Sequence, residues 1–332
     1  MSLFGSNGVT PEDIRQGAVG NCWLMGGASA VAEVPGRMEN VFLNNGNCLS
    51  EQGIYGVNIY TLGVPHTIIV DDYLPLREVW NGWSTLFAHI GDDNSLWGPI
   101  LEKAMAKFHG NYNHLEGGNP VYSVRTLTGA PYEMLFHRGW STVPATSAET
   151  LWERLVAHDG SNDILQAGTP GSSDQARNEF GLSNNHAYTV LGVKTMSTGE
   201  KLIKMRNPWG VETYSGDFSD ASELWTRELI DETGREIDDD GIFYMPLEAY
   251  HAQVEQTFIS YDTSDWFQGY YLKLNDTTQN KGKWSTCGSS CTRHELFVQS
   301  ATDQTVWVTA NTWDERGSAT ECKIDSKKHH SI

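Results

Sequence analysis

The chain has 332 residues, which is enough for two or three folded domains. Its formal net charge of −19 argues against nucleic acid and anionic membranes as main partners, because both are negatively charged themselves. No apolar run is long enough to span a bilayer, no signal peptide is recognisable, and the odd count of five cysteines fits a reducing compartment. These features predict a cytoplasmic protein without a membrane segment or a disulfide framework.

The first predicted helix covers residues 22–33 and begins at a cysteine. Unpaired N–H groups and the dipole at a helix N-terminus favour a thiolate, which is the nucleophilic form of Cys22. Gln16 precedes it in a glycine-containing stretch, and its side-chain amide is suited to donate to an oxyanion together with the backbone N–H of Cys22. A free cysteine is often only a small buried apolar residue, so this stretch alone leaves both interpretations open. The many small residues of the helix predict close packing against its neighbours.

Apolar periodicity predicts a mixture of helices and strands along the rest of the chain. Residues 111–131 are rich in glycine, asparagine and proline, which indicates a boundary between two subdomains. Residues 168–182 are polar and lack periodicity, which predicts a loop. Because this segment comes just before His186, a candidate catalytic residue, we expect the loop to lie beside the substrate cleft. The predicted strands are 54–60, 66–71, 163–167 and 242–245, and the predicted helices are 95–109 and 147–158, with a helix or turn at 221–230.

Two later strands supply a general base and a partner for it. His186 lies at the start of a predicted strand over residues 185–192, and Asn207 directly follows a second strand over residues 201–206. A tight turn between these strands would bring His186 and Asn207 to the same end of a hairpin. The histidine can then take the proton from Cys22, while the asparagine accepts from the other ring nitrogen. Each residue has an ordinary structural explanation alone, but the three in this order favour a Cys-His-Asn triad.

The stretches around the cysteine, the histidine and the asparagine resemble the protease core of calpains, which are papain-like cysteine proteases of the cell interior. The resemblance covers about residues 6–260 and includes the Leu-Trp-Gly-Pro segment at residues 96–99. It implies an α+β, papain-like core of two subdomains. A helical subdomain (1–125) would carry the nucleophile and a β-rich subdomain (126–262) the histidine and asparagine. Residues 263–332 resemble the truncated start of the C2-like β-sandwich that follows the calpain core.

The resemblance also assigns roles to residues at the matching positions. It implies Cys22 as the nucleophile, His186 as the base, Asn207 as the residue that orients the base, and Gln16 as part of the oxyanion hole. Trp209 matches a tryptophan that is wedged between the two halves of an inactive calpain core. One departure is Asn185, which stands where most relatives have glycine and is expected to narrow the cleft.

Calpain cores are activated by calcium, with one ion in each half, and this chain matches the expected ligands only in part. Tyr122 and Arg125 occupy the region where the first site expects a glutamate. Thr213 and Ile242 replace two glutamates of the second site. Because calcium takes about six to eight oxygen ligands, several of them carboxylates, we predict that calcium dependence is weakened or absent. The matching positions are Ser6, Gly8 and Asp13 at the first site and Asp220, Asp238 and Asp240 at the second.

The leading functional hypothesis is a cysteine endopeptidase that cleaves intracellular proteins in extended conformation and needs no organic cofactor. An alternative is a catalytically silent scaffold or calcium sensor on the same fold, although retention of the triad and Gln16 favours activity. A less favoured alternative is a transglutaminase-type acyl transferase, which would want an aspartate in place of Asn207 and a shorter spacing between cysteine and histidine. Further domains or a regulatory subunit are expected outside this chain.

Overall fold

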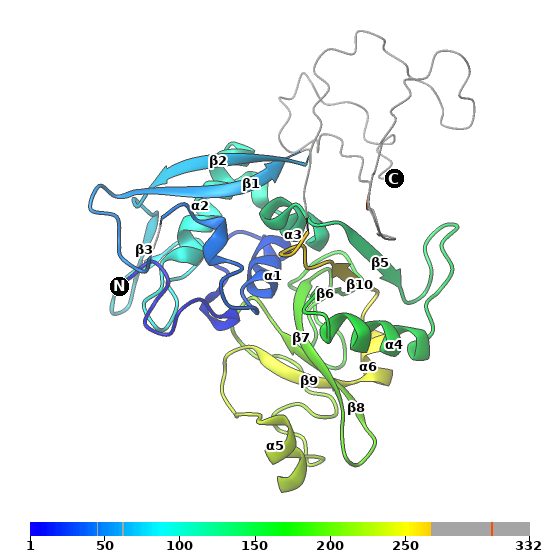
Figure 1. Cartoon of the computed structure of the whole chain (residues 1–332). Coiled ribbons are helices and arrows are strands. Elements are labelled where there is room, and N and C mark those ends of the chain that lie inside the picture. Colours follow the sequence, from blue (N-terminus) through cyan, green and yellow to red (C-terminus); the bar gives the residue numbers. More distant parts are fainter. Residues whose placement is uncertain (45, 62, 267–306, 308–332) are drawn as a thin grey trace, which may run out of the picture.

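The structure is a computed structural model that describes residues 1–44, 46–61, 63–266 and 307 (Figure 1). The β unit predicted from residue 263 onward therefore lies almost entirely outside the described residues. Helices and an antiparallel sheet together confirm the predicted α+β class.

Helix α1 (Cys22–Val31) lies at the centre of the molecule, and all of its residues are buried (Figure 1). It packs against helix α3 (Pro120–Thr128) on one side and against two strands of the main sheet on the other. A Cβ atom at Gly27 would lie 1.7 Å from the Oγ atom of Ser123 on α3, so the two helices approach this closely only because residue 27 is glycine. The predicted close packing of this helix is confirmed.

The half of the molecule that contains the N-terminus combines helices with two short hairpins. Its apolar core draws on residues between Leu3 and Leu127, with Ile164 added from the main sheet. Strands β1 and β2 pair antiparallel, as do β3 and β4. The elements are η1 (Pro11–Asp13), η2 (Glu39–Val41), β1 (Ile54–Thr61), β2 (Val64–Asp71), β3 (Leu76–Val79), β4 (Gly82–Thr85), α2 (Trp97–His109) and η3 (Tyr112–Leu115).

The other half is built on a six-stranded antiparallel sheet with the order β5-β10-β6-β7-β8-β9. A second apolar core, drawn from residues between Leu151 and Ile259, packs this sheet against helices α4 and α6. The elements are β5 (Tyr132–Phe136), α4 (Ala148–Asp159), β6 (Ile164–Gly168), β7 (Ala187–Thr195), β8 (Lys201–Arg206), α5 (Arg227–Thr233), β9 (Ile242–Pro246), α6 (Leu247–Gln253) and β10 (Gln256–Ser260).

Strands β7 and β8 are neighbours in the sheet, and their register fixes the position of the predicted base and its partner. Thr189 pairs with Arg206, so the residue before β7 and the residue after β8 lie at the same end of the hairpin. This end of the hairpin lies beside α1, where the Thr189 hydroxyl donates to the Gly26 carbonyl at 2.8 Å. The predicted hairpin arrangement is confirmed.

Helix α3 corrects the prediction that residues 111–131 form only a boundary. The side chain of Asn119 accepts the Val121 N–H at 3.2 Å, Pro120 occupies the first helical position, and Gly129 ends the helix with φ 73°. The asparagine, proline and glycine are therefore start and stop signals of a helix. Strands β3, β4, β5 and β10 and helix α6 were also not predicted. No helix among the described residues combines the length and the apolar character that crossing a membrane requires.

Candidate active site

Cys22 is the first residue of α1, as its sequence pattern predicts, and only 8% of it is exposed. Burial raises the pKa of its thiol to about 11, although backbone N–H groups at Ala187, Trp23 and Cys22 itself favour the thiolate. Loss of hydration thus outweighs the helix N-terminus. This corrects the expectation of a favoured thiolate, since the resting form in this conformation is the neutral thiol.

His186 lies immediately before β7 and is 3% exposed. Its backbone is fixed by Thr169, whose Oγ1 accepts the His186 N–H at 3.0 Å and whose N–H donates to the His186 carbonyl at 3.0 Å. Burial lowers the pKa of the imidazole to about 4, against the opposing effect of its hydrogen bond with Asn207. The imidazole is therefore neutral at physiological pH in this conformation. The preceding Asn185 has φ 46°, a left-handed conformation that glycine adopts without strain and asparagine tolerates.

Asn207 follows β8, and its side chain sets the tautomer of His186. Its Oδ1 atom accepts the Trp209 N–H at 3.1 Å, and a backbone N–H can only donate, so this atom is the amide oxygen. The same oxygen lies 2.9 Å from Nε2 of His186, which must then carry the ring proton. Nδ1 is left as an unprotonated acceptor, and it has no hydrogen-bond partner within the described part of the chain. This is the tautomer that a general base for Cys22 needs.

The indole of Trp209 packs against the imidazole of His186, with ring centroids 4.4 Å apart and an interplanar angle of 47°. The ring of Tyr188 contacts the same imidazole edge-on at 4.9 Å. The residue predicted as an inter-subdomain wedge is therefore in direct contact with the candidate base.

Gln16 is nearly buried, and its Nε2 atom donates to the Val19 carbonyl at 2.9 Å. One N–H of this amide is thus used within the loop, and the other is left to donate elsewhere. The backbone of Gln16 donates to the Pro208 carbonyl at 2.9 Å, which ties the loop to the turn after Asn207. Gln16, His186 and Asn207 are in this way brought to one region at the N-terminus of α1.

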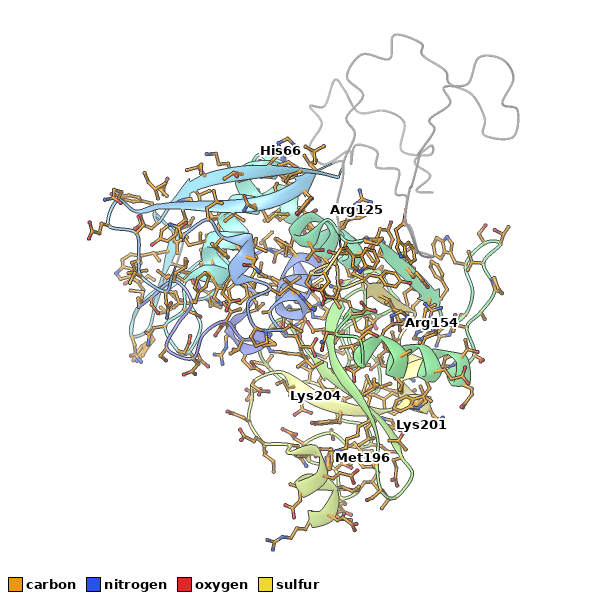
Figure 2. All side chains as sticks on the ribbon, in the orientation of Figure 1. His66, Arg125, Arg154, Met196, Lys201 and Lys204 are labelled. Carbon is orange, nitrogen blue, oxygen red and sulfur yellow. The ribbon has the colours of Figure 1, made fainter. Side chains whose placement is uncertain are left out.

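The first expected calcium site is centred on Asp13, which is 5% exposed. Its Oδ2 atom already accepts the indole N–H of Trp97 at 2.7 Å and the Thr10 N–H at 2.9 Å. Ser6 and Gly8 lie in the chain segment that leads into this turn. Arg125, labelled in Figure 2, lies on α3, where its guanidinium is 5.6 Å from the centroid of the Tyr122 ring.

The second expected calcium site contains a residue that the sequence interpretation missed. Arg235, whose side chain is 2% exposed, lies 2.9 Å from Oδ1 of Asp220 and also donates to the Asp220 carbonyl at 3.1 Å. The carboxylates of Asp238 and Asp240 accept backbone N–H groups of their own loop, and within the described ranges no three His, Cys, Asp or Glu residues gather to hold a metal. As arranged, these residues do not fit a calcium ion, because a guanidinium already neutralises Asp220.

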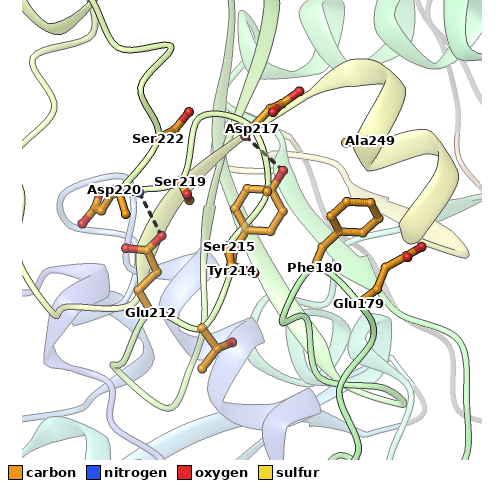
Figure 3. Close-up of a pocket in the computed structure, with 13 residues that line it drawn as sticks. Glu179, Phe180, Glu212, Tyr214, Ser215, Asp217, Ser219, Asp220, Ser222 and Ala249 are labelled. Atoms are coloured by element: carbon orange, nitrogen blue, oxygen red, sulfur yellow. Dashed lines mark hydrogen bonds between the residues drawn. The ribbon is translucent and has the colours of Figure 1, made fainter.

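A cavity of about 780 Å³ lies next to this site, between the residue 179–180 turn and the loop over residues 212–222 (Figure 3). Its acidic lining residues include Glu212, whose pKa is raised to about 8 by burial and by the neighbouring Asp220. The Asp220 N–H donates to Glu212 at 3.3 Å. None of the candidate catalytic residues lines this cavity, whereas Asp220 does, so the cavity is separate from the triad.

Comparison with known proteins agrees with this geometry. The family model described as calpain family cysteine protease matches residues 1–261. The chain is 33% identical over 225 residues to the calpain-type cysteine protease ADL1 of Oryza sativa subsp. japonica, which covers 68% of this chain and 10% of the relative. It is 31% identical over 300 residues to calpain-9 of Rattus norvegicus, which covers 86% of this chain and 42% of the relative. The chain therefore spans less than half of either relative, and it belongs to the calpain family of cysteine proteases.

Proposed function

We propose that this chain is a cysteine endopeptidase that cleaves protein substrates in extended conformation, with Cys22 as nucleophile. The observation that carries the proposal is the hydrogen bond from His186 to Asn207 at 2.9 Å, which leaves Nδ1 as an unprotonated acceptor. The two apolar cores support a division of the protease core into subdomains 1–125 and 126–262.

In the proposed reaction, Nδ1 of His186 takes the thiol proton as Cys22 Sγ attacks the scissile carbonyl carbon. The Gln16 amide and the Cys22 backbone N–H donate to the resulting oxyanion. The C–N bond then breaks, and the imidazolium gives its proton to the leaving amine. Water attacks the thioester with His186 as base, which releases the acid product and restores the thiol.

Because Cys22 and His186 are both buried, a conformational change must precede the chemical reaction. Cys22 and His186 are both neutral here, and burial is the main cause for each. We infer that the contact between Trp209 and His186 opens when a substrate binds, since a scissile bond must reach both side chains. Entry of polar groups would lower the cost of forming a thiolate–imidazolium pair.

Calcium dependence is weakened or absent in this proposal, because Arg235 supplies a positive charge at Asp220. We further propose a cytoplasmic location, together with additional domains or a regulatory subunit outside these 332 residues. The coverage of 42% of calpain-9 is consistent with such further parts.

A catalytically silent scaffold or calcium sensor is the second candidate function. The observation that favours it is the deep burial of Cys22, whose thiol pKa of about 11 leaves little thiolate at neutral pH. The presence of the full triad favours the protease.

The deciding experiment follows cleavage of an unfolded, fluorescently labelled protein while free calcium is varied from chelator to millimolar levels, with Cys22→Ala as control. A rate that needs Cys22 and stays flat across the titration supports the proposal in full. A Cys22-dependent rate that appears only with calcium supports the protease and contradicts weakened calcium dependence. Absence of cleavage at every calcium level contradicts the protease and favours the scaffold.

A further inference from the structure

Glu102 lies on α2 and is 1% exposed, although an ionised carboxylate is costly to bury unless its oxygens are hydrogen-bonded. Both of its oxygens are used. Oε1 accepts the side-chain N–H of Asn21 at 2.8 Å, and Oε2 accepts the backbone N–H of Ala88 at 2.8 Å. These two partners come from different segments, and the candidate nucleophile directly follows one of them.

The bond to Asn21 reaches the start of the nucleophile helix. The Asn21 carbonyl accepts the N–H groups of the first helical turn, at 2.8 Å from Leu24 and 3.1 Å from Met25. The Asn21 N–H donates to the Val19 carbonyl at 2.9 Å. The Val19 carbonyl also accepts a hydrogen bond from Nε2 of Gln16 at 2.9 Å. One residue therefore connects Glu102 both to the helix that carries Cys22 and to the amide of the oxyanion hole.

The bond to Ala88 reaches the same loop from its other side. The segment over residues 86–89 pairs with residues 15–18, since Ala18 donates to the Leu86 carbonyl at 3.0 Å and His89 donates to the Arg15 carbonyl at 2.8 Å. The two backbones are so close that a Cβ atom at Gly17 would lie 1.9 Å from the Phe87 carbonyl oxygen. A shift of residues 86–89 would therefore move residues 15–18 with it.

We propose that Glu102, as a carboxylate, is a positioning residue that holds the oxyanion hole in register with Cys22. It does so by fixing Asn21 and Ala88 on the two sides of the loop that carries Gln16. This inference rests on the proposed function, because an oxyanion hole matters only if the chain performs acyl transfer.

The ionised form of Glu102 accepts strongly at both oxygens. In a neutral carboxyl group the hydroxyl oxygen is a much weaker acceptor, and a glutamine turns an N–H toward one of the two donors. Burial, opposed by the hydrogen bonds from Ala88 and Asn21, raises the pKa of Glu102 to about 7. Tyr112 on η3 responds to this charge, since its pKa is raised above its usual range by burial first and by Glu102 second. Protonation of Glu102 near neutral pH would then weaken one of its two hydrogen bonds and release one side of the loop over residues 15–18.

The test compares Glu102→Gln with Glu116→Gln. Glu116 is exposed, its side chain lies 3.5 Å from the position of a Cβ atom at Gly20, and the substitution makes the same change of charge beside the same loop. Steady-state cleavage is measured from pH 5.5 to 8.5. We expect the wild-type kcat to rise through about pH 7. Glu102→Gln should lower kcat by roughly 10-fold or more, change KM little, and abolish this rise, while Glu116→Gln keeps the wild-type profile.

A second measurement does not depend on catalysis. Hydrogen–deuterium exchange of peptides that cover residues 15–21 and 86–89 should be faster in Glu102→Gln than in the wild type and Glu116→Gln, with the sheet of β5 to β10 unchanged. If the wild type does not cleave, the proposed function fails and this exchange pattern alone decides whether Glu102 positions the loop. Unchanged exchange in both segments overturns the inference. So does an unchanged kcat and pH profile in an active Glu102→Gln variant.

Discussion

The Oδ1 atom of Asn207 lies 2.9 Å from Nε2 of His186, and the two residues are 0% and 3% exposed. In this dry environment the imidazole has a fixed orientation and a fixed tautomer, because the amide oxygen is itself held by the Trp209 N–H. Nδ1 is therefore the unprotonated ring nitrogen before any substrate binds.

Asn207→Ala should lower kcat by roughly 100-fold, because the imidazole would lose the acceptor that fixes its tautomer. The melting temperature should also fall by several degrees, since His186 and the Trp209 N–H both lose their acceptor and each unsatisfied donor costs about 1–3 kcal/mol. Both are measured on the same preparation by peptide cleavage and thermal melting. A variant that stays folded and keeps the wild-type kcat would contradict the role given to Asn207.

Alkylation of Cys22 by iodoacetamide should be slow at pH 7 and should speed up steeply toward pH 10, because only the thiolate reacts and the thiol pKa is about 11. The rate is measured by peptide mass spectrometry, with the exposed Cys48 as an internal reference for an accessible thiol. A fast rate that is flat between pH 6 and 9 would instead reveal a preformed thiolate–imidazolium pair.

Gly27→Ala should destabilise the protein by about 1–3 kcal/mol, because the new methyl group would overlap the Ser123 side chain at 1.7 Å and push α3 away from α1. Gly26→Ala is the matched control. Its Cβ would lie 3.6 Å or more from Ala187, which is ordinary van der Waals contact, and alanine favours the helix. Urea unfolding of both variants gives the comparison, and equal losses would contradict the close approach of the two helices.

Glu33→Gln should stabilise the protein more at pH 9 than at pH 6. Burial and the nearby Asp159 raise the pKa of Glu33 in the folded protein to about 8, from 4.5. A raised folded-state pKa gives stability that is complete below the unfolded value and is lost as pH rises through about 8. The advantage of glutamine should therefore grow by about 1–2 kcal/mol between these two pH values.

Chemical denaturation at both pH values measures this difference. Glu153→Gln, which makes the same charge change at an exposed position of α4, serves as control and should show little pH dependence. A constant advantage for Glu33→Gln at pH 6 and pH 9 would show that Glu33 is not held in a desolvated site.

Local sequence patterns were enough to predict the helix that begins at Cys22 and the two strands beside His186 and Asn207. These elements carry strong periodicity, and their chemistry depends on residue type at a helix or strand end. The start of α3 at Pro120 was misread, because asparagine, proline and glycine mark helix ends as well as loops. The strand β10 lies between two partners that are distant in sequence, and a five-residue run gives no sign of which strands it joins.

The partners of buried charged groups were beyond what local patterns reveal. Glu102 occupies an unremarkable position in a helical repeat, and its two hydrogen-bond partners come from segments 81 and 14 residues away. The same holds for the thiol of Cys22, whose pKa depends on how deeply the folded chain buries it. The local sequence pattern predicts that Cys22 lies at a helix N-terminus, but only the tertiary structure shows how much desolvation of the thiol costs.

Arg235 is joined to Asp220 through the chain as well as through the ion pair. A bound metal ion comes and goes with its free concentration, so a site that needs one reports on that concentration. A covalently attached guanidinium has no free concentration and cannot be removed by a chelator. As long as the ion pair is intact, Asp220 therefore has the same positive neighbour at every free calcium concentration.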